Sequence, residues 1–343
     1  MKVIELTAPR LDASRLAEYD TPSPGEAPLR LRAASLNSLV IERNFRGVVS
    51  GNIKMENVMR RIVITVALLW SFLAVTIASA QTITRTAPAV AVQLYTLDGG
   101  SLYFKDFSVL SDTGEYGGKS GYLAVPSYLI HHGKDWLLWD TGLGDEIAAK
   151  PKGETKFGLI FTVHRTLTSQ LAQIGLKPDD IHYVALSHLH PDHVGNITLF
   201  PKATFLIPKV EMAWALGEPT PETIERSLVV PLAHLHVDNN DDDRDVFSDG
   251  TVQILKAPGH TPGHRILLVK LAKSGYLLIS GDLYHRREDY EKGFIPTGNT
   301  ERADTLASFA RFARIRDNAH ARVIIQHSPE DFAAMPAFPK FLD

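Results

Sequence analysis

The sequence predicts a layered α/β sandwich, in which strands are grouped into runs with helices between them. Short runs of β-branched, aromatic and leucine residues are bounded by Gly, Pro or Asp, which is typical of strands. Segments with the apolar stripe of a helix are fewer and lie between those runs. The chain has 343 residues, of which 44% are hydrophobic and 22% charged, so it can bury a large core and is unlike a disordered or coiled-coil protein.

The predicted elements follow one another along residues 81–343, which we expect to form one large domain. Strands are expected at Val90–Leu97, Gly121–His131, Asp135–Trp139, His182–Ser187, Ala203–Ile207, Thr251–Leu255, Ile266–Leu271, Tyr276–Ser280 and Arg322–Gln326. Helices are expected around Gly158–Ile174, from Lys209 onward and over Glu301–Asp317. Grouped strands with interspersed helices favour a layered sandwich over a doubly wound sheet.

Composition limits the chemistry that the chain can carry. It contains no cysteine, which excludes a disulfide framework, a thiolate metal site, an iron–sulfur cluster and a cysteine nucleophile. Any metal ion must therefore be held by His, Asp or Glu. The formal charge of −3 gives no sign of the basic surface that binds nucleic acid, so we expect no nucleic-acid partner.

A signal peptide is predicted inside the chain, at residues 55–80. Arg60 and Arg61 precede the uncharged run Ile62–Ile77, and the small residues Ala78–Ala80 follow it. This order of positive, apolar and small residues is typical of a secretory signal with its cleavage site. The run has 16 residues, fewer than the roughly 20 of a membrane-spanning helix, so no stable membrane span is expected after cleavage. A buried core helix is the weaker alternative.

The position of this segment predicts where the natural protein begins. A signal must lie at the start of a chain, so Met55 or Met59 is the expected start and residues 1–54 are expected to be extraneous or fused. The protein would then be periplasmic or secreted. If translation begins at Met1 instead, the protein would be cytoplasmic or anchored in the membrane by the apolar run.

The densest group of metal-binding residue types follows a predicted buried strand. His188, His190, Asp192 and His193 fall within six positions. Because side chains at i and i+2 of an extended backbone point the same way, His188 and His190 can share one cation. The turn at Pro191 lets Asp192 and His193 face a second cation nearby. Structural histidines have no need of this spacing, so the segment predicts a metal site.

Three further candidate ligands follow strands later in the chain. His260 lies in a loop bounded by glycines, Asp282 follows the strand Tyr276–Ser280, and His327 follows the strand Arg322–Gln326. Taken alone, each is equally well explained as a turn or capping residue. Together with the first group, they complete two coordination spheres of nitrogen and oxygen atoms.

These motifs resemble those of the metallo-β-lactamase superfamily, and within it most closely those of the N-acyl-homoserine lactone lactonases. The resemblance covers most of residues 90–343 and includes Trp139–Gly142, Asp192–Asn196 and Gly281–His285. It implies an αββα sandwich with two divalent metal ions, expected to be Zn²⁺, between the sheets. In the family arrangement one ion is held by His188, His190 and His260, the other by Asp192, His193 and His327, and Asp282 bridges them.

The resemblance further implies a hydrolase whose partner is a small-molecule lactone. Two divalent ions about 3.5–4 Å apart can share a water, lower its pKa to near neutrality and so supply a metal-bridging hydroxide as nucleophile. Asp192 is then a ligand that can also relay a proton, and Tyr284 is the candidate phenol for the carbonyl or its oxyanion. The oligomeric state is left open, with a homodimer as one option.

The chain departs from the family pattern at two places. Some lactonases carry a tyrosine three positions after the bridging aspartate, where this chain has His285, and Tyr284 stands one position earlier. A packed aromatic role for Tyr284 and an exposed polar role for His285 are the alternatives. Ser328 stands where the family commonly has Asp, and loss of that carboxylate would weaken metal binding.

Other activities of the superfamily stay open on the sequence alone. A bridging carboxylate fits lactonases and thioesterases of the glyoxalase II type, and it distinguishes both from β-lactamases. A catalytically weakened metal-binding sensor is a further alternative, because loss of groups that orient metal ligands costs roughly 10- to 100-fold in activity. The favoured function is the opening of N-acyl-homoserine lactones, which is quorum quenching.

Overall fold

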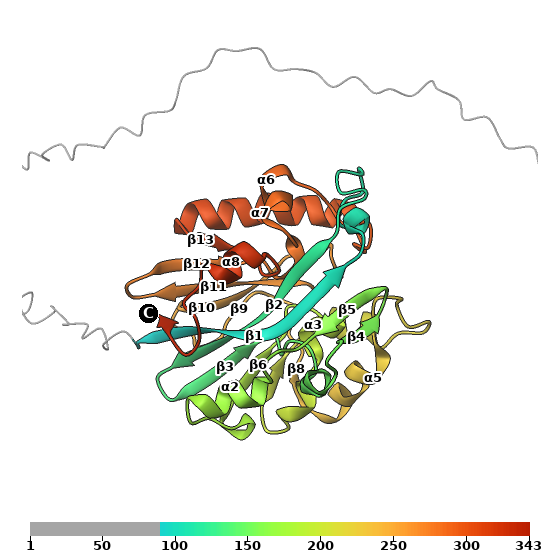
Figure 1. The fold of residues 1–343 in the computed structure, drawn as a ribbon. Coiled ribbons are helices and arrows are strands. Elements are labelled where there is room, and N and C mark those ends of the chain that lie inside the picture. The colour runs from blue at the N-terminus through green and yellow to red at the C-terminus, as the bar shows by residue number, and fades with distance from the viewer. Residues whose placement is uncertain (1–89) are drawn as a thin grey trace, which may run out of the picture. The chain divides into compact units, whose positions relative to one another are not determined.

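Two β-sheets lie between two layers of helices in the computed structural model, which describes residues 90–343. The helix α7 (Arg302–Ala319) covers the outer face of one sheet, and α2 (Leu167–Gln173) covers the outer face of the other (Figure 1). This arrangement confirms the expected αββα sandwich. The expected extraneous segment 1–54 and the expected signal at 55–80 lie outside the described residues.

The larger sheet has the strand order β4-β5-β1-β2-β3-β6-β7-β8, and β14 pairs with the free part of β1. Its strands are β1 (Val92–Phe104), β2 (Gly121–His132), β3 (Asp135–Trp139), β4 (Glu154–Lys156), β5 (Leu159–Thr162), β6 (Tyr183–Ala185), β7 (Thr204–Leu206), β8 (His236–Asp238) and β14 (Phe341–Leu342). Strands β1 to β3 pair antiparallel, whereas β3, β6, β7 and β8 run parallel.

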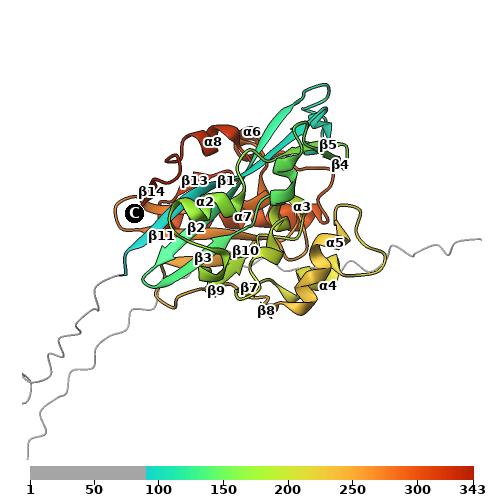
Figure 2. The same ribbon diagram turned by 60° about the horizontal axis from the view of Figure 1, so that its bottom comes forward.

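The smaller sheet has the order β13-β12-β11-β10-β9 and is antiparallel except for the pair β12–β13. Its strands are β9 (Arg244–Asp245), β10 (Val252–Lys256), β11 (Arg265–Leu271), β12 (Gly275–Ile279) and β13 (Arg322–Ile324). The other helices are α3 (Pro191–Val194), α4 (Lys209–Ala215), α5 (Arg226–Val229), α6 (Arg287–Lys292) and α8 (Pro329–Ala333). Figure 2 shows α4 and α5 beside the strands β7 and β8.

Successive side chains along each strand point to opposite faces of the sheet and therefore pack in different layers. In β3, Leu137 and Trp139 pack between the two sheets, whereas Leu138 packs against the helical layer outside. In the smaller sheet, Leu278 of β12 points outward and packs with Phe312 of α7. Both faces of each sheet are therefore buried, which explains why the strands read as nearly continuous apolar runs.

The helix expected around Gly158–Ile174 is wrong in its first half, where the chain forms β5, and correct only in α2. Phe157 and Gly158 have φ angles of 52° and 76° and make the tight turn between β4 and β5. Thr166 then begins α2, because its side chain accepts a hydrogen bond from the backbone N–H of Ser169. The short apolar run of β5 suits either structure, and pairing with β1 decides the outcome.

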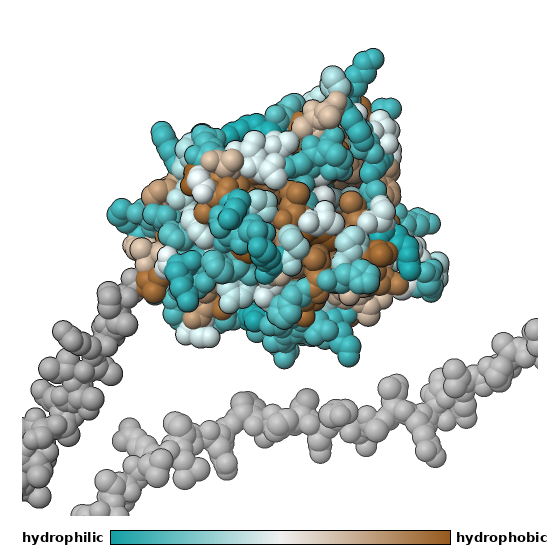
Figure 3. Space-filling model, turned by 90° about the horizontal axis from the view of Figure 1, so that it is seen from below, coloured by the Kyte–Doolittle hydropathy of each residue, from teal (hydrophilic) through white to brown (hydrophobic). Residues whose placement is uncertain are grey.

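The other expected strands and helices are present, and β1 runs well beyond its expected end. No helix within residues 90–343 is long and apolar enough to cross a membrane. On the side of α2 and α5, hydrophobic surface residues are interspersed with hydrophilic ones (Figure 3). The candidate ligands lie on the loops that follow β6, β10, β12 and β13, at the carboxyl ends of these strands.

Two glycines let β1 and the loop after β3 come unusually close. A Cβ atom added to Gly142 would lie 2.7 Å from the Cα atom of Gly99, and the N–H of Leu143 donates to the Gly99 carbonyl at 2.9 Å. The Gly142 carbonyl in turn accepts from the N–H of Gly195, just after α3. This contact ties β1 to the segment that carries the first group of candidate ligands.

We predict that Gly142→Ala destabilises the fold more than Gly275→Ala does. Both glycines have positive φ, at 69° and 73°, so both alanines suffer the left-handed backbone penalty of about 1–2 kcal/mol. Only Gly142 also meets backbone atoms, which adds overpacking of about 1–3 kcal/mol, whereas Gly275 has open space. Urea denaturation measures both free energies of unfolding, and equal losses would contradict the close approach.

Candidate metal centre

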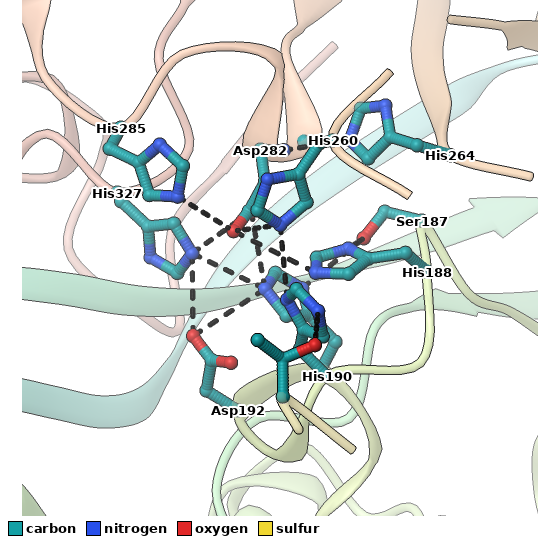
Figure 4. Close-up of polar contacts among 12 residues, drawn as sticks. Ser187, His188, His190, Asp192, His260, His264, Asp282, His285 and His327 are labelled. Carbon is teal, nitrogen blue, oxygen red and sulfur yellow. Dashed lines mark hydrogen bonds and ion pairs between the residues drawn. The ribbon is translucent and has the colours of Figure 1, made fainter. Parts of the chain in front are cut away.

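Seven side chains that the sequence predicts as metal ligands converge at the carboxyl ends of β6, β10, β12 and β13 (Figure 4). They are His188, His190, Asp192, His193, His260, Asp282 and His327, and none is more than 9% exposed. The structure divides them into two groups, with Asp282 lying between the two. Side chains from both sheets are thus brought to one buried position.

The local backbone after β6 explains how one short segment serves both groups. His190 has extended backbone and stands just before the first turn of α3, which Pro191 begins. His188 and His190 therefore belong to the extended part, while Asp192 and His193 lie on the helical turn. This is the division that the sequence spacing predicts.

The first group consists of His188, His190, His260 and Asp282. One donor atom from each lies within 4.8 Å of all the others. The Nε2 atom of His260 is 3.0 Å from Nδ1 of His190, and Oδ2 of Asp282 is 3.5 Å from the same Nε2. The Nε2 atom of His188 is 3.7 Å from that Oδ2 atom.

The second group consists of Asp192, His193 and His327, together with the other oxygen of Asp282. The Nε2 atoms of His193 and His327 are 3.2 Å apart. Oδ1 of Asp282 lies 3.2 Å from the first of these atoms and 3.0 Å from the second. Oδ2 of Asp192 lies 3.5 Å and 3.4 Å from the same two atoms. Asp282 thus presents one oxygen to each group.

In His193 and His327, the ring nitrogen that faces away from the centre is hydrogen-bonded, and this fixes which nitrogen faces the centre. Nδ1 of His193 contacts Oδ2 of Asp140 at 2.8 Å, and Nδ1 of His327 contacts the Ala124 carbonyl at 2.6 Å. Because carboxylate and carbonyl oxygens only accept, these Nδ1 atoms carry protons, so the Nε2 atom of each ring faces the centre and can bind a metal ion when the ring is neutral. The ring nitrogens and the carboxylate oxygens of the second group therefore face one another, an arrangement that protons or a bound metal ion can satisfy.

The spacing of these donors fits divalent metal ions. Tetrahedral coordination with bonds of about 2.0–2.1 Å places neighbouring ligand atoms about 3.3 Å apart. The closest contacts within the two groups run from 3.0 to 3.7 Å. In addition, His188 Nε2 and Asp282 Oδ1 are buried without a hydrogen-bond partner. Such atoms are costly to bury unless a ligand engages them, so the donor set fits two cations bridged by Asp282.

Burial and neighbouring charges shift the pKa values of the candidate ligands. Burial lowers the pKa of His190 to about 4 and holds the pKa of His188 and His260 well below the usual value, which keeps these rings neutral. Burial alone would raise the pKa of Asp282, but His327, His193 and His188 hold it well below its usual range. The first group therefore combines neutral imidazoles with an ionised carboxylate, whereas Asp282 and Asp192 raise the pKa of His193 and His327 against the effect of burial, so a metal ion would replace protons there.

Asp140 orients the second group from a turn after β3, and it is not itself one of the candidate ligands. Besides His193, its carboxylate accepts from the N–H of Ser187 at 2.7 Å and from Nε2 of Gln326 at 2.6 Å. Asp140 has a φ angle of 55°, a conformation that Asp tolerates better than most residues. One carboxylate thus links β3, the segment after β6 and the end of β13.

Glu211 of α4 is a supporting residue that the sequence analysis missed. Its buried carboxyl accepts from the N–H of Leu189 at 3.0 Å and from the N–H of Gly263 at 2.8 Å. It therefore ties the loop that carries the first ligands to the loop that carries His260. Burial raises the pKa of Glu211 to about 7. A polar residue on a helix face that is otherwise apolar was the only signal in the sequence.

His264 is not one of the candidate ligands, because both of its ring nitrogens are engaged elsewhere. Its Nδ1 donates to the Ala257 carbonyl, and its Nε2 accepts from the N–H of Asp282, both at 2.8 Å. Ser328 caps the N-terminus of α8, where its side chain accepts a hydrogen bond from the N–H of Asp331. Both side chains fix loops next to the ligands.

Tyr284 does not reach the centre, so the expected contact of its phenol with a substrate carbonyl is corrected. Its ring stacks on Phe309 of α7, with centroids 4.4 Å apart, in the layer outside the smaller sheet. Tyr284 has extended backbone, and successive side chains of extended backbone point to opposite sides. His285 consequently points into the centre, where it is 7% exposed instead of being a surface residue.

A cavity of about 160 Å³ opens above the two groups. Its floor is formed by ligands of both groups, and its wall is apolar. The wall residues are Leu102, Phe104, Leu123, Phe157, Leu159 and Phe161, which come from β1, β2 and the β4–β5 hairpin. A small molecule with a polar head and an apolar tail fits such a site.

The fold and the two donor groups are those of the metallo-β-lactamase superfamily. The family model of the metallo-β-lactamase superfamily matches residues 120–327, and the chain belongs to this superfamily. Among curated relatives, N-acyl homoserine lactonase AttM of Azorhizobium caulinodans is 30% identical over 267 residues, which cover 74% of this chain and 99% of the relative. N-acyl homoserine lactonase AiiA of Bacillus thuringiensis is 27% identical, over 66% of this chain and 89% of the relative.

Solved structures of lactonases resemble the chain in three dimensions. An N-acyl homoserine lactone hydrolase with the product N-hexanoyl-L-homoserine at its catalytic metal centre is 25% identical, with a TM-score of 0.65 and coverage of 74% of this chain and 99% of that one. AidC, a dizinc quorum-quenching lactonase, is 22% identical with a TM-score of 0.55, covers 74% of this chain and 90% of that one, and shares the fold.

We predict that Asp140→Asn weakens metal binding at the second group by roughly 10- to 100-fold. An amide at this position cannot accept from His193, Ser187 and Gln326 together, so the His193 ring loses its fixed orientation. Titration of metal-free protein against a chelating indicator measures the affinity. Asp179→Asn, which changes an exposed carboxylate that belongs to neither donor group, serves as control. Unchanged affinity in Asp140→Asn, with an intact circular dichroism spectrum, would contradict the assignment.

Proposed function

We propose that this protein is a metal-dependent hydrolase that opens the lactone ring of N-acyl homoserine lactones. The observation that carries the proposal is the shared carboxylate of Asp282 between two donor groups, set at the floor of a cavity with an apolar wall. The relatives named above, which are lactonases matched along almost their whole length, support the same substrate class.

Ring opening adds water across an ester bond, giving one carboxylate and one hydroxyl group. Two bound divalent ions supply an activated water and polarise the carbonyl. The chain holds the reacting groups: Asp282 fixes the two donor groups relative to each other, and the imidazoles present oriented lone pairs. Asp192 lines the cavity, and neighbouring imidazoles hold its pKa at about 2 against the effect of burial. The carboxylate is therefore ionised, and its place in the cavity lining puts it where it can relay a proton to the leaving ring oxygen.

The apolar wall accounts for the acyl half of the substrate. Leu159 and Phe161 lie on β5, and Phe157 stands at the tip of the β4–β5 hairpin with half of its surface exposed. An acyl chain that leaves the centre along this wall buries apolar surface, which favours binding by about 25 cal/mol per Å². The polar lactone then faces the ligands.

Zinc is the ion that we propose for both groups. Imidazole and carboxylate donors at nearly tetrahedral spacing suit Zn²⁺, although manganese, iron and cobalt accept the same donor types. Mass spectrometry of trace metals in protein purified without added metal tests the identity. We expect two zinc ions per chain, and a stoichiometric amount of another metal would overturn this part of the proposal.

We also propose that residues 55–80 direct the protein out of the cytoplasm. The support is the order of charged, apolar and small residues in that segment. Expression in a bacterial host, followed by fractionation and N-terminal sequencing, tests the proposal. A mature chain that begins at Gln81 in the periplasm is expected, whereas an uncleaved chain in the cytoplasm would contradict it.

We predict that activity requires both the metals and Asp282. Chelator-treated protein should open no lactone, added Zn²⁺ should restore turnover, and Asp282→Asn should lose more than the roughly 100-fold expected when an orienting group is lost. Proton release from N-hexanoyl homoserine lactone measures turnover, with Asp179→Asn as matched control and a thioester and a cephalosporin as competing substrates. Hydrolysis of a competitor, with no lactone opening by metallated protein, would contradict the proposed function.

We predict that Phe157→Ala discriminates between acyl chains. Its exposed ring lines the cavity mouth, so its removal should raise KM several-fold for a decanoyl lactone and leave KM for a butanoyl lactone nearly unchanged. Leu306→Ala, which shortens an exposed apolar side chain on α7, controls for general effects. An equal change for both lactones would place the acyl chain elsewhere.

A further inference from the structure

One polar side chain that lines the cavity floor belongs to neither donor group and does not orient a ligand. The floor includes His190, Asp192, His260, Asp282 and His327, all of which belong to the donor groups. Thr223 also lines the cavity, but its hydroxyl lies 2.9 Å from Nε2 of His190 and orients that ring. The remaining polar lining residue is His285.

His285 lies close to the ligands, but its ring lacks the outer hydrogen bond that fixes the orientation of other imidazoles in the centre. Nε2 lies 3.3 Å from Oδ2 of Asp282, and the ring stacks on His327 with centroids 5.8 Å apart (Figure 4). Nδ1 is buried and has no hydrogen-bond partner within residues 90–343. By contrast, His193, His260 and His327 each bond an acceptor through the outer ring nitrogen.

The backbone at His285 is nevertheless fixed. The buried carboxylate of Asp289 accepts from the N–H of His285 at 3.3 Å and from the N–H of Arg286 at 2.8 Å. The hydroxyl of Tyr116 donates to the same carboxylate from the opposite side. The imidazole, which lines the cavity, is thus positioned by its backbone and not by a hydrogen bond to Nδ1.

A role as an additional metal ligand is not favoured by this geometry. Each donor group already offers four atoms when Asp282 is included, which completes a tetrahedral set. His285 is not among the side chains whose donor atoms all lie within 4.8 Å of one another in the first group. Its place beside both groups, facing the cavity, suits contact with the substrate instead.

We propose that His285 is a catalytic residue that donates a hydrogen bond from Nε2–H to an oxygen of the lactone carboxyl group. The proximity of Nε2 to Asp282 favours the proton on that nitrogen. A fixed N–H donor stabilises the negative charge that gathers on this oxygen as the ring opens, and no proton is transferred. This proposal rests on the proposed lactonase function.

The test compares three variants of the full-length, metal-replete protein. His285→Phe keeps an aromatic ring but removes the donor, and should lower kcat by about 10²-fold with little change in KM. His285→Tyr offers a phenolic donor and should recover most of the lost rate. Tyr284→Phe changes the neighbouring residue, which faces α7, and should leave kcat unchanged. Each variant should bind two metal ions per chain.

A second readout separates hydrogen bonding from a structural effect. Calorimetry with the product N-hexanoyl-L-homoserine should show weaker binding by His285→Phe than by the wild type or His285→Tyr. Wild-type kcat in His285→Phe, loss of metal from it, or failure of His285→Tyr to exceed it would overturn the proposal for His285 alone. A wild-type protein that opens no lactone would overturn the proposed function together with it.

Discussion

The whole arrangement depends on one constraint, the burial of the Asp282 carboxylate among the imidazoles of both donor groups. A buried charge facing other acceptors is strongly unfavourable unless cations compensate it. The seven donors come from four loops on two sheets, so the constraint binds both halves of the sandwich together. Metal binding and the closing of the fold around the centre are therefore energetically coupled.

The scaffold meets this constraint by presenting ligands where strands end. Strands must be hydrogen-bonded along their length, but their ends are free to turn, and the apolar core just below holds them rigidly. Two buried carboxyl groups then join the loops: Asp140 links the ends of β3, β6 and β13, and Glu211 links the loops of His188 and His260. Such supports orient the imidazoles before any ion or substrate is bound.

Local spacing made part of this centre predictable from the sequence. His188, His190, Asp192 and His193 lie in one short segment, whose extended and helical parts assign each side chain to a group. Asp282 and His327 were recognisable because each follows an apolar strand. The core strands were predictable for the same reason, since a buried strand between two layers has few alternatives.

Long-range geometry explains what sequence reasoning missed. Tyr284 and His285 differ by one position of extended backbone, and the turn at Asp282 decides which of them faces the cavity. Glu211 acts on backbone N–H groups of distant loops, for which no local pattern exists. The short apolar segment around Phe161 suits either a strand or a helix, and its pairing with β1 makes it a strand.

Anomalous diffraction from crystals of metal-replete protein, collected at the absorption edge of the bound metal, is the most direct test of the central claim. The account predicts two peaks about 3.5–4 Å apart, one in each donor group, with the two oxygens of Asp282 bound to different ions. A single peak, or a peak distant from Asp282, would contradict the proposal that one carboxylate joins two metal sites.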